Sequence, residues 1–528
     1  MNKAEAFLKK HHMHWSQIDP EQELEKLLRE METVRSGGAG SVKMIPTYVG
    51  DYSLPDRETE VTVIDIGGTN VRSAVMTILP DGTARIGTIT AFLTPGVKEP
   101  TDTAGFFSEI VRGCRQDLRT GSIGICFSLA TIPQKDRDAV MVAGGKQIKV
   151  TDMLGKRVGE SFREAMIREG IAEIFPEGNS AAGNAAAGNG VSEKIAAEDV
   201  RITVINDTVA AALGGAMEQP QPPDAQEGAQ ASNAQPQASN AQPQPPDAQP
   251  QASNAQPQAS KAQPQASNAQ QQASDTQEGA QTSNAQPQAS DTQESAQSPG
   301  APRGRKGYSG YVGFIYGTGT NICYREPSGE LINVESGAYT GFPAGDMDDA
   351  YDKTLIDTGD DRFEKMVSGG YQGGLMMHIL EKGAAEGMIR RTTYERLRDT
   401  GGITSKDISA FAKDPESSGR IADACAEASE KEFLLELFDL ITERSARLCS
   451  IVITAALLRA GIGTDHKAPA FITAEGSTFL KQKDFREKLE RQMDALAGEK
   501  YRLFWEFHTV ENAVMKGIAA AAAGENYE

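Results

Sequence analysis

Residues 61–74 read VTVIDIGGTNVRSA, and this stretch carries the clearest structural signal in the chain. Alternating β-branched residues lead into Asp65, two glycines, a threonine and an asparagine, after which the apolar pattern resumes. The pattern predicts a strand, a tight turn and a second strand. Because Gly67 and Gly68 permit backbone angles that a side chain would forbid, we expect the amides of this turn to converge on an anionic oxygen. A plain hairpin turn fits the same residues.

Three later stretches add to this turn. They are INDT at residues 205–208, YGTGTN at residues 316–321 and AEGS at residues 474–477. Together with the first turn they outline a cleft for a nucleotide. Asp65, at the end of its predicted strand, can hold the water shell of Mg²⁺.

The composition limits the partners of the chain. It has 528 residues, enough for two domains, and a formal net charge of −20. A field of this sign repels nucleic acids and anionic membranes, so we expect neither as a partner. Without an apolar signal region or a membrane-length apolar run, the cytoplasm is the expected location. The five scattered cysteines favour core thiols over disulfides or a zinc site.

The N-terminal segment predicts a packing helix. Residues 19–22 provide an acid, a proline and a glutamine at a helix start, and apolar residues recur on one face up to residue 35. His11, His12 and His14 precede this helix in a segment that we expect to be frayed. Since no acidic or cysteine partner is visible, metal binding at this cluster is the less favoured interpretation.

Residues 84–205 alternate between strand and helix patterns. We expect a third strand over residues 84–92, helices over 106–118 and 152–169, and buried strands over 122–129 and 201–205. This alternation predicts an α/β domain. Its buried strands deliver Ser128 and the Asn206-Asp207 pair to strand ends.

Residues 218–305 form a low-complexity insert of Ala, Gln, Pro, Ser and Asn, with seven-residue units such as ASNAQPQ. Each unit offers only alanine as an apolar group, and its proline interrupts a helix, so the composition predicts disorder. Closing a long flexible loop costs little more than closing a short one, so a fold can tolerate the insert. A spacer is the plain interpretation, and no protein partner is identifiable from the tract.

The rest of the chain returns to folded patterns. We expect strands over residues 310–316 and 470–473 and a hairpin that reaches residue 335. Helical patterns cover residues 433–458, 484–496 and 511–523.

Two Gly/Thr turns with an Asn-Asp pair between them suit phosphoryl transfer from ATP. That reaction requires positioned phosphates, bound Mg²⁺ and an oriented nucleophile. Asp65, beside the glycine turn, suits magnesium. Asp207, at the end of a buried strand, suits the general base that accepts an alcohol proton. The alternative role for Asp207 is to cap the helix that follows it.

Seven stretches, in this order, resemble the hexokinase family, the sugar kinases with an actin-like ATPase fold. They are SVKMIPTYV, IDIGGTNVR, INDTVAA, GTGTNICY, INVESGAY, FEKMVSGGYQGG and AEGSTFLKQKDFREKL. The resemblance implies an α/β, two-domain actin-like ATPase (ribonuclease H-like) fold with a hinged cleft. In that scheme residues 1–45 pack on the large domain, 46–205 form the small domain, 206–512 form the large domain around the disordered insert, and 513–528 return to the small domain.

The resemblance also assigns site residues. It matches the catalytic base to Asp207 and the Mg²⁺ ligand, through water, to Asp65. The family's sugar-hydroxyl ligands match Ser128, Lys146, Asn206, Asn321, Glu335 and Glu364. Its ATP contacts match Gly67, Gly68, Thr69, Asn70, Arg72, Gly317, Thr318, Gly319 and Thr320, with Gly476 and Ser477 near the base and ribose. Outside this motif context, Glu335 and Glu364 fit equally well as surface acids.

Three positions depart from the family pattern. Ala130 ends a Ser-Leu-Ala stretch where the family usually has Ser-Phe-Pro, and Gly145 removes one sugar-contacting hydroxyl. Residues 512–517 replace the usual glycine-rich turn before the last helix, so we expect a looser or a reshaped closure hinge.

The resemblance implies a kinase that uses ATP and Mg²⁺ to phosphorylate a hexose, with glucose favoured, at the 6-hydroxyl for glycolysis. The alternative is a catalytically weak hexose sensor or scaffold that binds a partner through the insert. Retention of Asp65, Asp207 and both glycine turns favours the enzyme, because a sensor needs neither a base nor a metal ligand.

Overall fold

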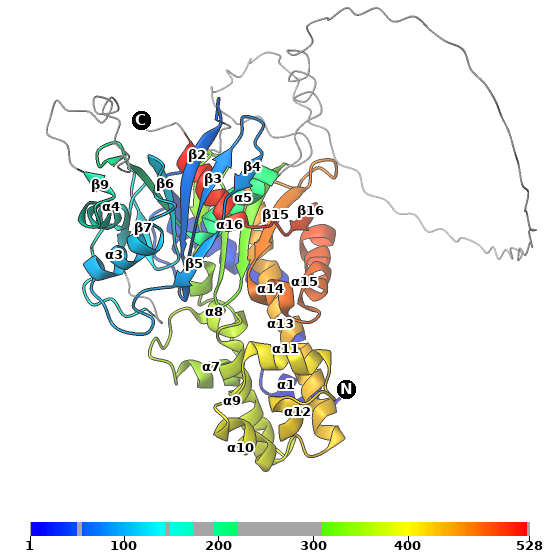
Figure 1. Ribbon diagram of the computed structural model, residues 1–528. Coiled ribbons are helices and arrows are strands. Elements are labelled where there is room, and N and C mark those ends of the chain that lie inside the picture. Colours follow the sequence, from blue (N-terminus) through cyan, green and yellow to red (C-terminus); the bar gives the residue numbers. More distant parts are fainter. Residues whose placement is uncertain (1, 50–54, 143–147, 174–194, 219–308, 525–528) are drawn as a thin grey trace, which may run out of the picture. The chain divides into compact units, whose positions relative to one another are not determined.

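The computed structural model describes residues 2–49, 55–142, 148–173, 195–218 and 309–524 (Figure 1). Three sequence predictions lie outside the described residues: the sugar ligand Lys146, the departure at Gly145 and the insert that follows Glu218. The described residues include two six-stranded sheets with helices packed on both faces of each. The predicted α/β fold class is therefore confirmed.

The stretch at residues 61–74 lies in the first sheet. The strands of this sheet are β2 (Thr59–Ile66), β3 (Asn70–Ile78), β4 (Ala84–Ile86), β5 (Thr90–Leu93), β6 (Ser122–Phe127) and β11 (Arg201–Ile205). Their order is β11-β6-β2-β3-β4, and β5 also pairs with β3. The predicted hairpin is confirmed, since β2 and β3 are antiparallel with Asp65 opposite Arg72. β6 and β11 run parallel to β2, as their continuous apolar runs predict.

Three predicted elements in this region have wrong bounds. The single strand expected over residues 84–92 is two strands, because the Gly87 amide turns to the Val75 carbonyl (2.9 Å) and ends β4. The helix expected over 106–118 is α3 (Thr103–Gly113). The helix expected from residue 152 is α4 (Val158–Arg168), because Asp152 instead accepts hydrogen bonds from the Thr103 amide (2.7 Å) and hydroxyl (2.8 Å).

Alternate residues of β2 face different layers. Ile64 and Ile66 pack in the cluster that contains the buried faces of α3 and α4. Val61 and Val63 pack in the cluster that contains α5 (Asp207–Glu218) and α16 (Ala513–Ala523). The sheet is thus buried on both faces, which fixes its register and the position of the strand ends.

The second sheet carries the other glycine turn. Its strands are β1 (Ile45–Thr47), β12 (Gly310–Tyr316), β13 (Thr320–Arg325), β14 (Leu331–Asn333), β15 (Ala470–Glu475) and β16 (Trp505–His508), in the order β1-β14-β13-β12-β15-β16. One face packs on α2 (Pro20–Arg35), α13 (Ala428–Ala460) and α15 (Phe485–Met493). α5 covers the other face, where Gly313 allows a close approach to the Thr208 carbonyl.

A helical layer extends beyond this sheet (Figure 1). It contains α7 (Asp346–Asp352), α8 (Arg362–Val367), α9 (Gln372–Ala385), α10 (Arg391–Asp399), α11 (Ser405–Lys413) and α12 (Arg420–Ala424). The N-terminus joins it, so the expectation of a frayed segment is wrong. α1 (Lys3–Lys10) buries Phe7 and Leu8 there, and His11 contacts Asp346 (2.8 Å) and Glu386 (3.0 Å) through its two ring nitrogens.

The last helix is joined by a turn that replaces the family's glycines. Asn512 adopts the left-handed conformation (φ 55°) that asparagine tolerates better than most residues. Gly517 then allows α16 to approach α5 closely, since a Cβ at this position would lie 1.7 Å from the Ala210 carbonyl oxygen. The structure therefore has a defined turn before α16, and the effect of this turn on closure stays a prediction.

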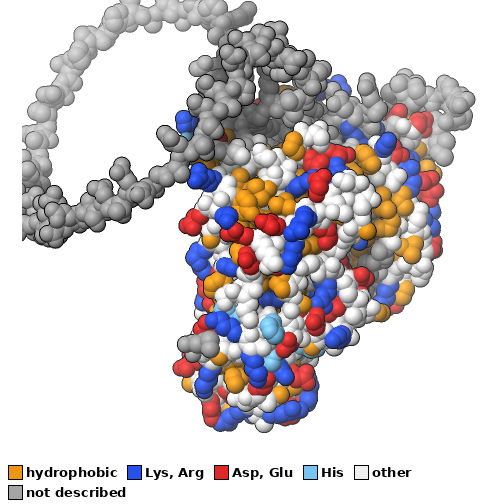
Figure 2. Space-filling view, turned by 180° about the vertical axis from the view of Figure 1, so that it is seen from behind, with side chains coloured by type: hydrophobic (Ala, Val, Ile, Leu, Met, Phe, Trp, Pro, Cys, Tyr) orange, Lys and Arg blue, Asp and Glu red, His pale blue; other side chains and the backbone are white. Residues whose placement is uncertain are grey.

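The described surface carries both charges. Figure 2 shows acidic and basic side chains interspersed over the face it presents, with short apolar areas between them. In the described ranges no helix has the length and apolarity needed to cross a membrane. Cys114, Cys126, Cys323 and Cys449 are buried and Cys425 is half-buried, as expected for core thiols.

Candidate active site

Three parallel strands bring the predicted polar residues to one edge of the first sheet. Asp65 lies opposite Cys126, and Cys126 lies opposite Ile205, so β2, β6 and β11 end in register. Adjacent strands are about 4.8 Å apart. Asp65, Ser128 and the Asn206-Asp207 pair therefore meet at the carboxyl ends of the strands, where open α/β sheets bind their ligands.

Asp207 is the first residue of α5, but it is not the cap of that helix. The cap is Asn206, whose side-chain oxygen accepts the Thr208 amide (2.9 Å) and whose carbonyl accepts the Ala210 amide (2.9 Å). Asp207 Oδ1 accepts from the amide (2.8 Å) and hydroxyl (3.3 Å) of Thr208, and no described residue donates to Oδ2. One oxygen is thus held while the other remains available.

The electrostatics of Asp207 suit a proton acceptor. Burial raises the pKa of Asp207 above its ordinary value, and the negative charge of Asp65 raises it further, whereas the Thr208 hydrogen bonds oppose the shift. A raised carboxyl pKa makes a stronger base. Burial also raises the pKa of the nearby Cys126 thiol, so this thiol stays protonated and acts as a core residue.

Asp65 is paired with Arg72 across the hairpin. The Nε and Nη2 atoms of Arg72 lie 3.1 and 2.6 Å from Asp65 Oδ2. The pair holds the guanidinium beside the glycine turn, where sequence reasoning placed a phosphate contact. Asp65 Oδ1 receives no N–H or O–H hydrogen bond from a described residue, so it is available as an oxygen donor.

The first glycine turn is held by its carbonyls. The Thr94 hydroxyl donates to the Gly67 carbonyl (2.8 Å), and the Thr94 amide donates to the Thr69 carbonyl (2.9 Å). Gly68, Thr69 and Asn70 are exposed. The sequence predicts that these glycines adopt backbone angles that a side chain would forbid. This prediction is wrong, because neither Gly67 nor Gly68 has a positive φ. At Gly67 the constraint is space, since a Cβ there would lie 3.2 Å from the Asn70 carbonyl oxygen.

The second glycine turn, residues 317–320, is held in the same way. The Gly317 carbonyl accepts from the Gly369 amide (2.8 Å) and the Thr478 hydroxyl (2.9 Å). The Thr318 carbonyl accepts from the Gly370 amide (3.0 Å). Both turns are therefore fixed before any ligand binds, as preorganised phosphate sites require.

Gly476 is the one site glycine that needs its conformational freedom. Its φ is 113°, and a Cβ would lie 2.3 Å from the Tyr316 carbonyl oxygen. The exposed Ser477 then begins α14 (Ser477–Lys481). The predicted base and ribose residues thus lie against the second glycine turn, since Gly476 also contacts Gly317.

Glu335 faces this region from the second sheet in a strained conformation. Its φ of 53° is left-handed, which is uncommon for a residue other than glycine and is typical of functional sites. Oε1 accepts from the side-chain amides of Asn333 (2.6 Å) and Asn321 (3.2 Å). Burial raises the pKa of Glu335, Asp207 and Asp361 raise it further, and the two amides oppose the shift.

Glu364 joins the second glycine turn to the same region. Its Oε2 accepts from the Thr320 amide (3.2 Å). A Cβ at Gly319 would lie 2.5 Å from this oxygen, so the glycine makes room for the carboxylate. Glu335 and Glu364 are both half-buried, so neither is the exposed surface acid that the alternative interpretation allowed.

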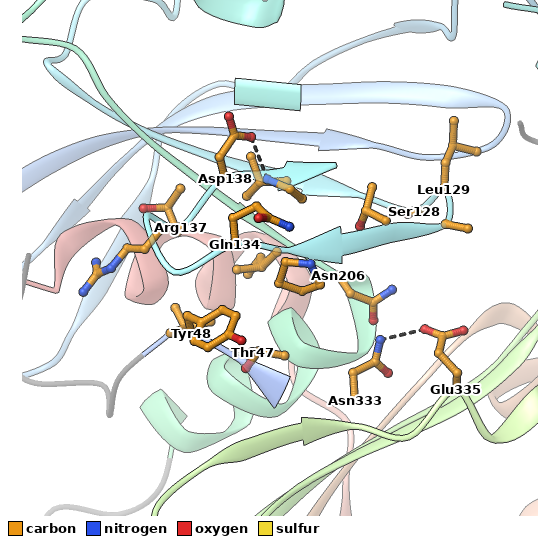
Figure 3. Close-up of a pocket in the computed structure, with 18 residues that line it drawn as sticks. Thr47, Tyr48, Ser128, Leu129, Gln134, Arg137, Asp138, Asn206, Asn333 and Glu335 are labelled. Carbon is orange, nitrogen blue, oxygen red and sulfur yellow. Dashed lines mark hydrogen bonds between the residues drawn. The ribbon is translucent and has the colours of Figure 1, made fainter. Parts of the chain in front are cut away.

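A cavity of about 120 Å³ connects the two sheets (Figure 3). Ser128 and Asn206 line it from the first sheet, and Glu335 lines it from the second. Sequence reasoning missed other lining residues: Thr47, Tyr48, Gln134 and Asn333. The only signal for Asn333 was its spacing, because residues two apart on a strand point to the same side and Glu335 was already a candidate.

Comparison with known proteins finds similarity over both parts of the described chain. Two family models, both described as hexokinase, match residues 4–217 and 311–524. The Oryza sativa protein named Hexokinase-7 is 29% identical over 215 residues, which cover 36% of this chain and 46% of that protein. A hexokinase of Plasmodium falciparum is 27% identical over 206 residues, 36% of this chain and 40% of its own. The chain thus spans less than half the length of these curated relatives.

Two solved structures share the fold. The hexokinase from Schistosoma mansoni complexed with glucose superposes with a TM-score of 0.62 at 17% identity, covering 99% of this chain and all of the other. A second hexokinase crystal structure gives a TM-score of 0.58 at 18% identity, covering 96% of this chain and 94% of the other. At these identities the likeness is one of fold.

Proposed function

The chain belongs to the hexokinase family, and on that premise we propose that it transfers the γ-phosphoryl group of ATP to the 6-hydroxyl of a hexose, with glucose favoured, to supply hexose 6-phosphate to glycolysis in the cytoplasm. The observation that carries the proposal is the environment of Asp207. A carboxylate with a raised pKa and an available oxygen lies directly after β11, next to Asn206, which lines the cavity together with Ser128 and Glu335.

In this proposal Asp207 Oδ2 accepts the proton of the sugar hydroxyl as it attacks phosphorus. Thr208 keeps the carboxylate oriented through Oδ1. Ser128, Asn206, Glu335 and Glu364 hold the other hydroxyls of the ring, together with Lys146, which lies outside the described residues. The glycine-turn amides, Thr318 and Arg72 stabilise the transferred group, and Gly476 and Ser477 lie beside the base and ribose.

The residues also fit a magnesium ion. Asp65 Oδ1 is a hard oxygen donor beside a phosphate-sized turn, and no described cluster of three or more metal-ligating side chains competes with it. Mg²⁺ usually binds through one or two carboxylates, waters and substrate phosphates. Asp65 would hold it through water, and the ion would neutralise phosphate charge.

An ADP-release assay tests the proposal. The full chain should release ADP with glucose, fructose, mannose or N-acetylglucosamine only when ATP, Mg²⁺ and a hexose are all present. Release that does not depend on any hexose would contradict it.

The insert separates the enzyme from the sensor or scaffold alternative. Replacing residues 219–305 with a short Gly/Ser bridge, while keeping Glu218 and its ion pair with Lys516, should leave turnover within about twofold. The assay is ADP release at saturating hexose, with the full chain as control. A large loss in a variant that unfolds at the same temperature as the full chain would favour a functional role for the insert.

Substitution of Gly319 should separate sugar binding from stability. In Gly319→Ala the new methyl would displace the flexible end of Glu364 from the Thr320 amide, so we expect hexose affinity to fall by about tenfold. The unfolding temperature should change little, since a side-chain end can move. Gly68→Ala is the matched control, because no atom lies within 4 Å of its Cβ position. Calorimetric titration with glucose measures the affinity of the two variants, and thermal unfolding measures their stability. Equal glucose affinities in Gly319→Ala and Gly68→Ala would refute the assigned role of Glu364.

A further inference from the structure

Asn333 is buried in the candidate sugar site and has no role in the proposal so far. It ends β14, where its backbone pairs with Ile45 of β1 on one side and Cys323 of β13 on the other. Its side-chain nitrogen donates to Glu335 Oε1 (2.6 Å), and its side-chain oxygen accepts from Asn321 (2.8 Å). Figure 3 shows Asn333 and Glu335 joined at the wall of the cavity.

Asn321 is fully used by its neighbours. Its Nδ2 donates to Asn333 (2.8 Å) and to Glu335 (3.2 Å). Its Oδ1 accepts from the backbone amides of Ile322 (2.7 Å) and Ser336 (3.2 Å). A side-chain amide has two N–H groups and two lone pairs, so all four are occupied. Asn321 therefore supports its neighbours here and would have to break one of these bonds to reach a sugar.

The two asparagines act on the same oxygen of Glu335. Both amide donors converge on Oε1, whereas no described residue donates a hydrogen bond to Oε2. Glu335 is also among the residues that line the cavity with Ser128 and Asn206. Since its backbone is held in a strained left-handed conformation, the carboxylate needs support from its neighbours to keep this orientation.

The charge of Glu335 depends on the same contacts. Burial and the negative charges of Asp207, on α5, and Asp361, before α8, raise the pKa of Glu335. Hydrogen bonds from Asn333 and Asn321 lower it. The shorter contact, from Asn333, contributes more to keeping the ionised form, which is the better acceptor for a sugar hydroxyl.

We infer that Asn333 is the positioning residue of the hexose site: it holds Glu335 Oε1 so that Oε2, as a carboxylate oxygen, accepts a hydroxyl hydrogen of the sugar. The inference rests on the proposed function, since it concerns the same hexose. It assigns Asn333 an effect that passes through Glu335, and it assigns Asn321 the same kind of support.

A double-mutant cycle tests whether Asn333 acts through Glu335. Asn333→Leu keeps the branched shape of the side chain but removes the donor to Glu335 and the acceptor for Asn321, and Glu335→Ala removes the carboxylate that Asn333 holds. Glucose affinity of the full chain should be measured by calorimetry between about pH 5.5 and 8.5, with Gln116→Leu, an exposed amide, as control. In the wild-type background, Asn333→Leu should weaken binding by about 10- to 100-fold at neutral pH. In the Glu335→Ala background, where Asn333 has no carboxylate to hold, it should add less than about twofold.

The pH profile distinguishes positioning from simple packing. Loss of the Asn333 donor raises the pKa of Glu335 further, so binding by Asn333→Leu should fail at a higher pH than binding by the wild type. If Asn333→Leu does not fold, Asn333→Asp serves, because it is isosteric and places an acceptor against Glu335. Adding Glu335→Gln to Asn333→Asp should then recover affinity. In this double variant the side-chain amide at position 335 donates to the carboxylate at position 333, which restores the contact with donor and acceptor exchanged.

Two results would overturn the inference. Equal losses in both backgrounds with a pH profile parallel to that of the wild type would make Asn333 a packing residue only. Failure of the wild-type chain to bind any hexose would remove the proposed function and the inference with it. The first result requires a wild type that binds glucose, so the two failures are distinguishable.

Discussion

Asp207→Asn should lower turnover by about 10²- to 10⁴-fold, the usual effect of removing a general base. Asparagine keeps an Oδ1 that accepts both hydrogen bonds from Thr208, so the geometry of the helix start is retained. Several other groups hold the sugar ring, and the proton is transferred only as the reaction proceeds. Glucose affinity should therefore stay within a small factor of the wild type.

The same substitution should stabilise the folded protein at neutral pH. Because burial and Asp65 raise the folded-state pKa of Asp207, ionisation of this group begins to favour the unfolded chain above the ordinary aspartate pKa and does so fully above the raised one. Asparagine removes this cost. The gain in unfolding temperature should be present at neutral pH and disappear as the pH falls below about 4, the ordinary aspartate value, because the carboxyl is then protonated in both states.

Thermal unfolding with and without glucose, and ADP release, measure the two effects together. Asp465→Asn, at an exposed aspartate, should change neither turnover nor unfolding temperature. Near-normal turnover in Asp207→Asn would refute the base. An unchanged or lower unfolding temperature would refute the electrostatic cost without affecting the catalytic assignment.

Elements that depend on local pattern were predicted well. The strands at residues 201–205 and 310–316 match β11 and β12 in their bounds, because each is a continuous apolar run that ends at a turn or polar pair. The start of α2 was also correct, since Asp19 accepts the amides of Glu21 and Gln22 as a cap. In these cases neighbouring residues supply the signals that fix the structure.

Elements that depend on distant contacts were predicted poorly. The local sequence predicts a helix start at Asp152, but the Asp152 carboxylate accepts a hydrogen bond from the Thr103 amide, 49 positions away. α1 has only eight residues, too few for a periodic pattern, and it is stabilised by packing in the cluster that contains Phe433. The site shows the same limit. Motifs identified Glu335, but the role of Asn333 depends on a carboxylate position that only the fold defines.

Gly517→Ala should strongly destabilise the folded protein. α16 packs on the first sheet and α5 packs on the second, so their crossing joins the two halves of the site. At this crossing a Cβ on Gly517 would lie 1.7 Å from the Ala210 carbonyl oxygen, and one on Gly214 would lie 2.0 Å from the Ala513 carbonyl oxygen. Because each obstacle is backbone, relief requires that one helix move away from the other.

Overpacking of this kind costs about 1–3 kcal/mol and more where backbone must shift, so we expect Gly517→Ala to lose about 3 kcal/mol of unfolding free energy. Turnover should fall as well, since α5 begins with Asp207 and its displacement moves the base. Gly383→Ala is the matched control. It lies in α9, its nearest neighbour is Met388 Cβ at 3.7 Å, and alanine there should gain up to about 1 kcal/mol from helix propensity. Urea unfolding measures the unfolding free energy of both variants. If Gly517→Ala loses no more stability than Gly383→Ala changes, α5 and α16 can move apart at little cost. The crossing of these helices would then not fix the position of Asp207.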